Sequence, residues 1–281
     1  MSAIDITLRR LATLDEYHEA CAIQREIWGS DFTEGVPTAI LMVVQKIGGV
    51  TAGAFDADDR MLGFVFGMTG VRDGRIVHWS DLLAVREPER RRGIGARLKE
   101  YQAELAREAG CQAMFWTFDP LQARNAQLNL TRLGARVAEY VPDMYGVTGS
   151  TLHGGIPTDR IVAEWVLGEH AGRGANARDK AATTVGTAIT TDLAVGDNAA
   201  DAISVGANGV PRATPLTDHE YVRVAIPVDI TAMLSSDPAR ALEWRLAVRE
   251  AMLTRLERGY SVVGFEHGSA DSHPCYVMRR S

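Results

Sequence analysis

The sequence has little cysteine, no long hydrophobic run and no excess of positive charge. Its three cysteines, Cys21, Cys111 and Cys275, are odd in number and widely spaced, and no C-x-x-C occurs. Neither a disulfide framework nor a zinc cluster is therefore expected. The longest apolar run, residues 39–44, is far too short to cross a bilayer. A net charge of −6 gives no general attraction to nucleic acid or anionic lipid.

Histidine spacing and the N-terminal pattern exclude two further classes. No pair among the seven histidines has the spacing of a metal-binding motif, so we expect no metal. From Ile4 to Leu8 apolar and polar side chains alternate, which predicts a strand and not a signal peptide. These features indicate a cytoplasmic protein with neither a nucleic-acid nor a membrane partner.

Aromatic residues are absent between Trp165 and Tyr221, a stretch rich in Ala, Gly, Asp, Asn and Thr. Such a composition is typical of a linker or flexible insertion, although alternating patches within it leave short strands open. We expect a first domain at 1–168, a linker or insertion at 169–220 and a small β-α-β-β unit at 221–281.

The hydrophobic pattern of the first domain predicts a mixed α/β fold with mainly antiparallel strands and a central βαβ crossover. The expected order of elements is β-α-α-β-β-β-α-β-α-β-β. Its best-defined helix begins at Ile94, has Leu98, Tyr101 and Leu105 on the same face, and ends before Gly110.

Two proline positions mark further helices. Pro37 suits the first turn of the second helix, and the expected buried face comprises Ile40, Val43, Val44 and Ile47.

In the C-terminal unit, Asp237 and Pro238 form an N-cap and first-turn pair. They predict a helix that extends to about Arg258, with strands before and after it.

A turn rich in arginine and glycine separates a strand ending at Val85 from the helix at Ile94. Residues 90–95 read R-R-R-G-I-G. Free N–H groups at a helix N-terminus bind phosphate oxygens, and arginines add charge-assisted hydrogen bonds. Gly93 and Gly95 would let a diphosphate approach the backbone. We therefore expect a diphosphate site at this turn.

Other interpretations of the turn are weaker or remain open. A Rossmann turn would need a third glycine where Leu98 stands, and the Gly-Lys-Ser/Thr of a P-loop is absent. A nucleic-acid contact would call for interleaved aromatic residues and a wider basic surface. A solvated run of charge beside a helix start remains an alternative.

The turn resembles the acyl-CoA signature R/Q-x-x-G-x-G/A of the GNAT superfamily of N-acyltransferases. The element order over residues 3–167 is also similar to that of this family. Asn125 and Leu133-Gly134 partly match the family's next landmark, an Asn-bearing helix that ends in Leu-Gly-Phe, but Ala135 replaces the usual Phe.

Three further segments look like an uncharacterised bacterial branch of predicted GNAT acyltransferases. They are residues 116–125, residues 155–160 and the C-terminal segment 239–259.

The resemblance implies a GNAT-like sheet flanked by helices, and acetyl-CoA or another acyl-CoA bound between the fourth and fifth strands. The residues expected to bind this co-substrate are Leu83, Ala84, Val85, Arg90, Arg91, Arg92, Gly93, Ile94, Gly95, Ala96 and Asn125.

Transfer to an amine requires a base and, for the leaving thiolate, an acid. Asp81 is our first candidate for the base and His78 the second; their odd spacing directs them to opposite faces of the strand. The family's frequent acid is a tyrosine, but Leu130 stands near that position, so Tyr145 is the substitute candidate. Residues expected to contact the acceptor are Thr117, Asp159 and Arg160, of which Asp159 and Arg160 could equally form an ion pair that holds their loop.

The resemblance implies direct transfer of an acetyl group, or of a small acyl group such as succinyl, from CoA to a small-molecule primary amine. A non-catalytic acyl-CoA-binding or sensor module is the competing interpretation, and a homodimer is left open.

Overall fold

The computed structural model describes most of the chain, namely residues 6–30, 34–90, 92–146, 155–168, 199–206, 208–269 and 272–281. Contacts divide the chain into two compact units. The first holds the described residues up to Trp116 together with 165–168, and the second holds the described residues of 117–164 and of 199–281. The domain boundaries expected from the sequence remain a prediction.

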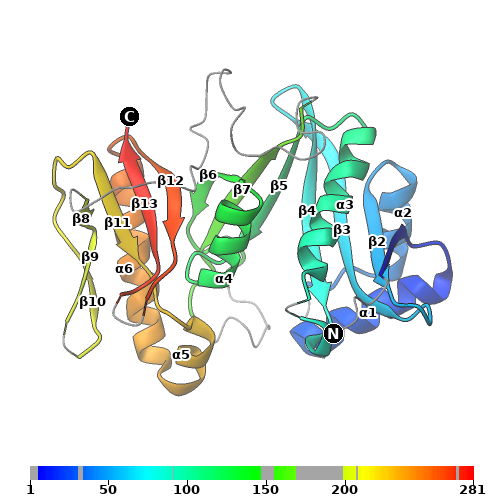
Figure 1. The fold of residues 1–281 in the computed structure, drawn as a ribbon, viewed down its shortest axis with the longest axis horizontal. Helices are drawn as coiled ribbons and strands as arrows, with labels where there is room; N and C mark the ends of the chain where they lie inside the picture. The colour runs from blue at the N-terminus through cyan, green and yellow to red at the C-terminus, as the bar shows by residue number, and fades with distance from the viewer. Residues whose placement is uncertain are drawn as a thin grey trace. The chain divides into compact units, whose positions relative to one another are not determined.

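The first unit is built on a sheet whose neighbouring strands follow the order β1-β2-β3-β4-β5 (Figure 1). The strands are β1 (Thr7–Arg10), β2 (Val50–Phe55), β3 (Met61–Arg72), β4 (Arg75–Val85) and β5 (Ala113–Phe118). The pairs from β1 to β4 are antiparallel, whereas β4 and β5 are parallel because α3 (Ile94–Glu108) makes the crossover between them. The predicted mixed α/β fold and its element order are confirmed.

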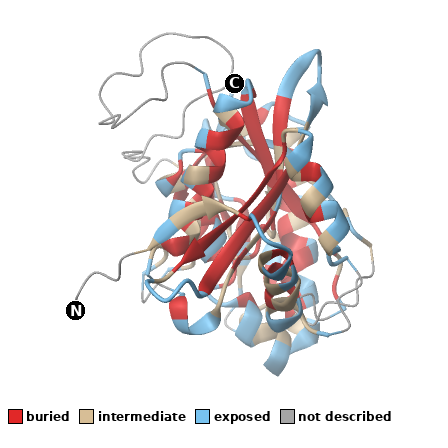
Figure 2. Cartoon of the chain, turned by 90° about the vertical axis from the view of Figure 1, so that its right-hand side faces the viewer, coloured by how far each residue is buried: buried red, intermediate tan, exposed pale blue. Residues whose placement is uncertain are grey.

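Two hydrophobic clusters show that helices cover both faces of this sheet. On one face α1 (Leu14–Trp28) and α2 (Thr38–Lys46) pack with Phe64 and Phe66 of β3. On the other, α3 contributes Ile94 and Leu98. Strands in Figure 2 are accordingly coloured as mostly buried, while the helices keep an exposed side.

Strand β4 is irregular near its middle. Phe66 of β3 pairs with Leu82 but the next residue, Gly67, pairs with Ser80, so Asp81 is the extra residue of a β-bulge. The register with β5 runs from Val77↔Ala113 to Trp79↔Phe115, and β4 continues to Val85 beyond it. The second half of β4 therefore extends past its pairing with β5.

Helix α2 begins where Pro37 predicted, but the expected buried face was wrong. Ile40, Val43 and Ile47 are 45%, 51% and 72% exposed, whereas Leu41 and Val44 are buried. The helix has two apolar stripes, one through Leu41 and Val44 and the other through Ile40, Val43 and Ile47. Only the first stripe faces the core.

The second unit contains three sets of strands, one of which is the antiparallel pair of Ile203–Val205 with Pro211–Ala213. β6 (Arg136–Val141) and β7 (Arg160–Val166) are antiparallel. A further sheet has the order β12-β13-β11-β8. Its strands are β12 (Tyr260–Glu266), β13 (Cys275–Arg280), β11 (Tyr221–Ala225) and β8 (Ala200–Asp201).

Three strands lie inside the segment expected to be a linker or insertion. They are β8, β9 (Ile203–Val205) and β10 (Pro211–Ala213). Residues 169–198 of that segment lie outside the described part of the chain.

Helices of the second unit match the predictions in part. α6 (Pro238–Leu256) begins at the expected cap, where the Asp237 carboxylate accepts a hydrogen bond from Arg240 N. α5 (Ile230–Ser236) was not predicted. The fourth helix of the expected order is instead the short α4 (Ala123–Ala126), followed by a π-helical segment, Gln127–Arg132.

The corrected face of α2 predicts unequal effects of two adjacent truncations. Leu41→Ala should reduce the free energy of unfolding by about 2–5 kcal/mol, because it leaves a cavity in the core. Ile40→Ala, one residue away and exposed, should change it by less than about 1 kcal/mol. Urea denaturation of both variants measures the difference, and an equal loss would contradict the packing described.

Candidate functional site

The N-terminus of α3 presents free backbone donors. Gly93 is its N-cap, with φ of 77°, a left-handed conformation that favours glycine. No side chain of the described residues caps this end, and the first backbone bond joins Arg97 N to Gly93 O at 3.2 Å. The N–H groups of Ile94, Gly95 and Ala96 are therefore available to an anion, which the helix dipole also attracts.

The arginines beside this turn are not equally available. Arg92 forms an ion pair with the buried Glu89, whose other oxygen accepts from Arg60 Nη2 at 3.1 Å. Arg90 is exposed and donates from Nε to Val85 O at 3.2 Å. Arg91 lies outside the described residues. The backbone donors and Arg90 thus fit a diphosphate better than Arg92 does.

Gly95 has a different environment from Gly93. A Cβ at Gly95 would lie 3.8 Å from side-chain atoms of Leu83 and Val85, which is ordinary van der Waals contact. Its predicted role, close approach of a diphosphate, remains a prediction.

The bulge residue Asp81 combines exposure with a perturbed carboxyl group. The residue is exposed, yet the surrounding protein removes enough water to raise its pKa, against a hydrogen bond from Trp79 that lowers it. A carboxylate with a raised pKa is a better proton acceptor, and such perturbed groups are common at functional sites.

His78 lies in a very different environment. It is fully buried, its Nδ1 is 3.2 Å from Thr69 Oγ1 and its Nε2 is 3.1 Å from Gln102 Nε2. Burial, and then the charges of Lys99 and Arg10, lower its pKa to about 4. The imidazole is therefore neutral at physiological pH and both ring nitrogens have neighbours, an arrangement that favours a packing role.

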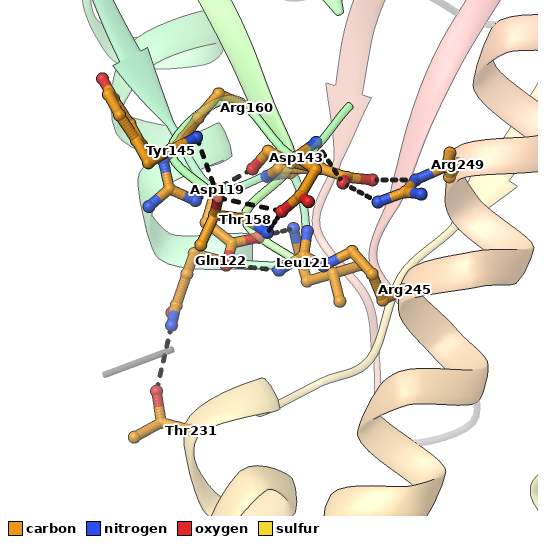
Figure 3. A network of polar contacts seen from close by, with 12 residues as sticks. Asp119, Leu121, Gln122, Asp143, Tyr145, Thr158, Arg160, Thr231, Arg245 and Arg249 are labelled. Atoms are coloured by element: carbon orange, nitrogen blue, oxygen red, sulfur yellow. Dashed lines mark hydrogen bonds and ion pairs between the residues drawn. The ribbon is translucent and has the colours of Figure 1, made fainter. Parts of the chain in front are cut away.

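In the second unit, Asp159 is the centre of a buried polar network. Its partners Asp143 and Arg249 are labelled in Figure 3. Its carboxylate accepts from Tyr140 Oη at 2.6 Å, from Asp143 N at 3.0 Å and from Arg249 Nε at 2.9 Å. Burial opposes ionisation, but the hydrogen bonds from Arg249 and Tyr140 outweigh it and lower the pKa of Asp159. This carboxylate is saturated by protein groups, so the geometry favours the role of holding its loop.

Asp119 makes a second link to α6. Its Oδ2 accepts from Arg245 Nη2 at 2.7 Å and its Oδ1 from Leu121 N at 2.8 Å. Asp119 does not cap the following helix, because α4 begins later and its N-cap is Gln122.

Two of the residues expected to contact the acceptor, Thr117 and Arg160, lie near Tyr145, the candidate acid. Thr117 Oγ1 is 3.0 Å from Tyr145 Oη, and the Arg160 guanidinium lies 5.2 Å from the centre of the Tyr145 ring. Arg160 is buried, and burial lowers its pKa. Asn125 is exposed on α4.

Sequence reasoning missed the buried charged residues Arg245 and Lys99 and the half-buried Arg249. Arg245 and Arg249 stand one helical turn apart on α6, a spacing that could have suggested a shared face. Lys99 is buried on α3, where it shares a helical face with Gln102 and Ala103. No simple pattern distinguishes such a lysine from an exposed one.

Comparison with known proteins gives fold-level likenesses. Ard1 from Thermoplasma volcanium is 17% identical, with a TM-score of 0.44 over 58% of this chain and 99% of that one. An acetyltransferase of the GNAT family from Streptococcus pneumoniae is 16% identical, with a TM-score of 0.46 over 58% and 99%. Arabidopsis thaliana Naa50, in complex with a bisubstrate analogue, is 12% identical, with a TM-score of 0.45 over 57% and 97%. No curated protein sequence matches.

One protein-family model matches the N-terminal part of the chain. The sequence model of the acetyltransferase (GNAT) family matches residues 21–134, which include the turn at the N-terminus of α3 and strands β2 to β5. The chain therefore carries a region, residues 21–134, that matches the GNAT acetyltransferases, a family that uses acetyl-CoA. No helix among the described residues is long and apolar enough to cross a membrane.

The network around Asp159 predicts a loss of stability that depends on pH. Asp159→Asn should lower the free energy of unfolding by about 3–5 kcal/mol at pH 7, because Arg249 would keep a partly buried charge without its partner. The wild-type carboxyl has a lowered pKa, so its contribution is present above the unfolded pKa and is lost as pH falls through the folded pKa.

Urea denaturation at pH 7 and at pH 3 measures this dependence. The difference between wild type and variant should shrink at pH 3, whereas the exposed Asp218→Asn should change little at either pH. A difference that is independent of pH would contradict the ion pair.

Proposed function

We propose that this chain transfers an acetyl or other small acyl group directly from CoA to the primary amine of a small molecule. The observation that carries the proposal is the uncapped N-terminus of α3 at the end of β4, within the region that matches the GNAT family. Small-molecule acceptors and direct transfer are our inference from the site chemistry.

The proposed acyl-CoA site lies in the first unit. N–H groups of Ile94, Gly95 and Ala96 would bind the diphosphate of acyl-CoA, with Arg90 beside them. The pantetheine arm would pair with the backbone of Leu83–Val85, the part of β4 that extends past its register with β5. Its thioester would then lie toward the bulge in β4.

Asp81 is the proposed base. Its raised pKa and its position at the bulge support removal of a proton from the attacking ammonium. The neutral amine attacks the thioester carbonyl, the C–S bond breaks, and the thiolate leaves and takes up a proton. Tyr145 remains the proposed acid, with its hydroxyl near Thr117.

Arg160 is the proposed acceptor contact in the second unit. Its buried guanidinium is held between the backbone of Asp159, which accepts from Nη1 at 2.9 Å, and the face of Tyr145. A guanidinium in this setting suits a carboxylate on the acceptor. Asp159 would support Arg160 by holding the loop.

Two substitutions at Gly93 test the diphosphate assignment. Asp and Asn have the same size and both tolerate a positive φ, but only Asp adds a negative charge beside the backbone donors. Gly93→Asp should bind CoA at least ~10-fold more weakly than Gly93→Asn. Isothermal titration calorimetry with CoA measures both, and equal affinities would contradict the assignment.

Replacement of Asp81 tests the base. Asp81→Asn should reduce kcat by about 10²–10⁴-fold while the affinity for CoA stays unchanged. Because a base works when ionised, wild-type activity should rise with pH through the raised pKa of Asp81, and the variant should lose this rise. Thiol release across a pH series measures both, and a variant with the wild-type profile would exclude Asp81.

A further inference from the structure

Lys99 is a buried cation without an anionic partner in the described part of the chain. The residue is 4% exposed, and its Nζ donates to Ser80 Oγ at 2.7 Å. The same Nζ lies 4.2 Å from the centre of the Trp116 ring. A buried ammonium is unstable without a counter-ion, and here desolvation lowers the pKa of Lys99 to about 7.

A second donor beside Lys99 also has no acceptor. Trp116 is 4% exposed, and among the described residues its indole Nε1–H has no hydrogen-bond partner. An edge contact with Trp165, at 6.4 Å between ring centres, helps to hold the ring. Buried polar groups of native proteins usually have partners, so this N–H indicates an acceptor that the described residues do not supply.

Both donors lie where β4 and β5 cease to pair. The last paired residues are Trp79 and Phe115, and the next residue of each strand is Ser80 and Trp116. Lys99 contacts both of these from α3. At about 3.3 Å per residue, β4 covers roughly 16 Å from Val85 back to Ser80. Lys99 therefore contacts β4 near its middle, at Ser80, some way along the strand from the proposed diphosphate site.

Nearby protein groups cannot neutralise Lys99. His78 is neutral, and the charges of Lys99 and Arg10 both lower its pKa, so the local potential is positive. Gln102 Oε1 is buried without a partner, but it is an uncharged acceptor. An anion would satisfy the ammonium and the indole N–H together.

We propose that Lys99 and the indole N–H of Trp116 bind a terminal carboxylate of the acyl group, so that the preferred donor is the CoA thioester of a short dicarboxylic acid. This inference rests on the proposed function, because it takes β4 as the path of the acyl-CoA arm. The carboxylate is unchanged in the reaction: the amide bond forms at the thioester carbon, the C–S bond breaks, and the thiol leaves with a proton.

Equilibrium binding without an amine tests the proposal. The probes are two stable thioethers of equal chain length, S-(3-carboxypropyl)-CoA and S-butyl-CoA, titrated at pH 6.5, where Lys99 with a pKa of about 7 is largely charged. Wild type should prefer the carboxylate probe by about 10- to 100-fold. Lys99→Met, which keeps length and removes charge, should abolish the preference.

Two further variants keep the test decisive if Lys99→Met does not fold. Trp116→Phe keeps an aromatic ring but removes the N–H, and it should reduce the preference several-fold. Ser80→Ala removes only the hydroxyl neighbour of Lys99 and should retain most of the preference. Equal binding of both probes by wild type, or a preference unchanged in both Lys99→Met and Trp116→Phe, would overturn the proposal.

Failure of this inference is distinguishable from failure of the proposed function. If both probes bind equally and Gly93→Asp weakens both, the acyl-CoA site stands and only the carboxylate assignment is lost. If neither probe nor CoA binds to wild type, the acyl-CoA site itself is wrong and the carboxylate assignment falls with it.

Discussion

The arrangement of the first unit depends on the limited pairing between β4 and β5. After Trp79↔Phe115 the register ends, and the bulge at Asp81 interrupts the pairing of β4 with β3 soon afterwards. Among the described residues, the second half of β4 is therefore unpaired on the side of β5. Asp81 lies on this strand, Lys99 contacts it at Ser80, and α3 begins after the strand has ended at Val85.

The second unit depends on ion pairs between α6 and the segments that precede it. Arg245 and Arg249, one turn apart, bind Asp119 and Asp159 (Figure 3). Tyr276 of β13 adds a hydrogen bond from its hydroxyl to Pro120 O at 2.7 Å. Within this unit, the C-terminal segment therefore supports the loops that carry Asp119 and Asp159.

Much of the fold could be predicted from the sequence because its helices have clear ends and its strands clear patterns. The face of α3, the cap at Asp237 and the strand at 75–85 were all evident from local sequence. The error at α2 arose because two apolar stripes were present and only packing decides which is buried. The π-helical segment depends on tertiary contacts and has no comparable local pattern.

The candidate site was less accessible to prediction than the fold. The hypothesis of a diphosphate site at residues 90–95 needs only the sequence, because free N–H groups at a helix N-terminus bind phosphate oxygens. Whether Arg92 is available depends on Glu89, and whether Lys99 is buried depends on how α3 rotates against β4. Both are consequences of side-chain packing between elements, which the sequence of one element does not determine.

Mass spectrometry of the reaction product tests the central claim most directly. Wild-type protein would be mixed with acetyl-CoA and succinyl-CoA and with a panel of amino acids and polyamines. The account predicts an N-acylated amine formed in equal amount to the released CoA, and only in the presence of that amine. Tight binding of CoA with no acylated product from any amine would contradict it and favour an acyl-CoA sensor.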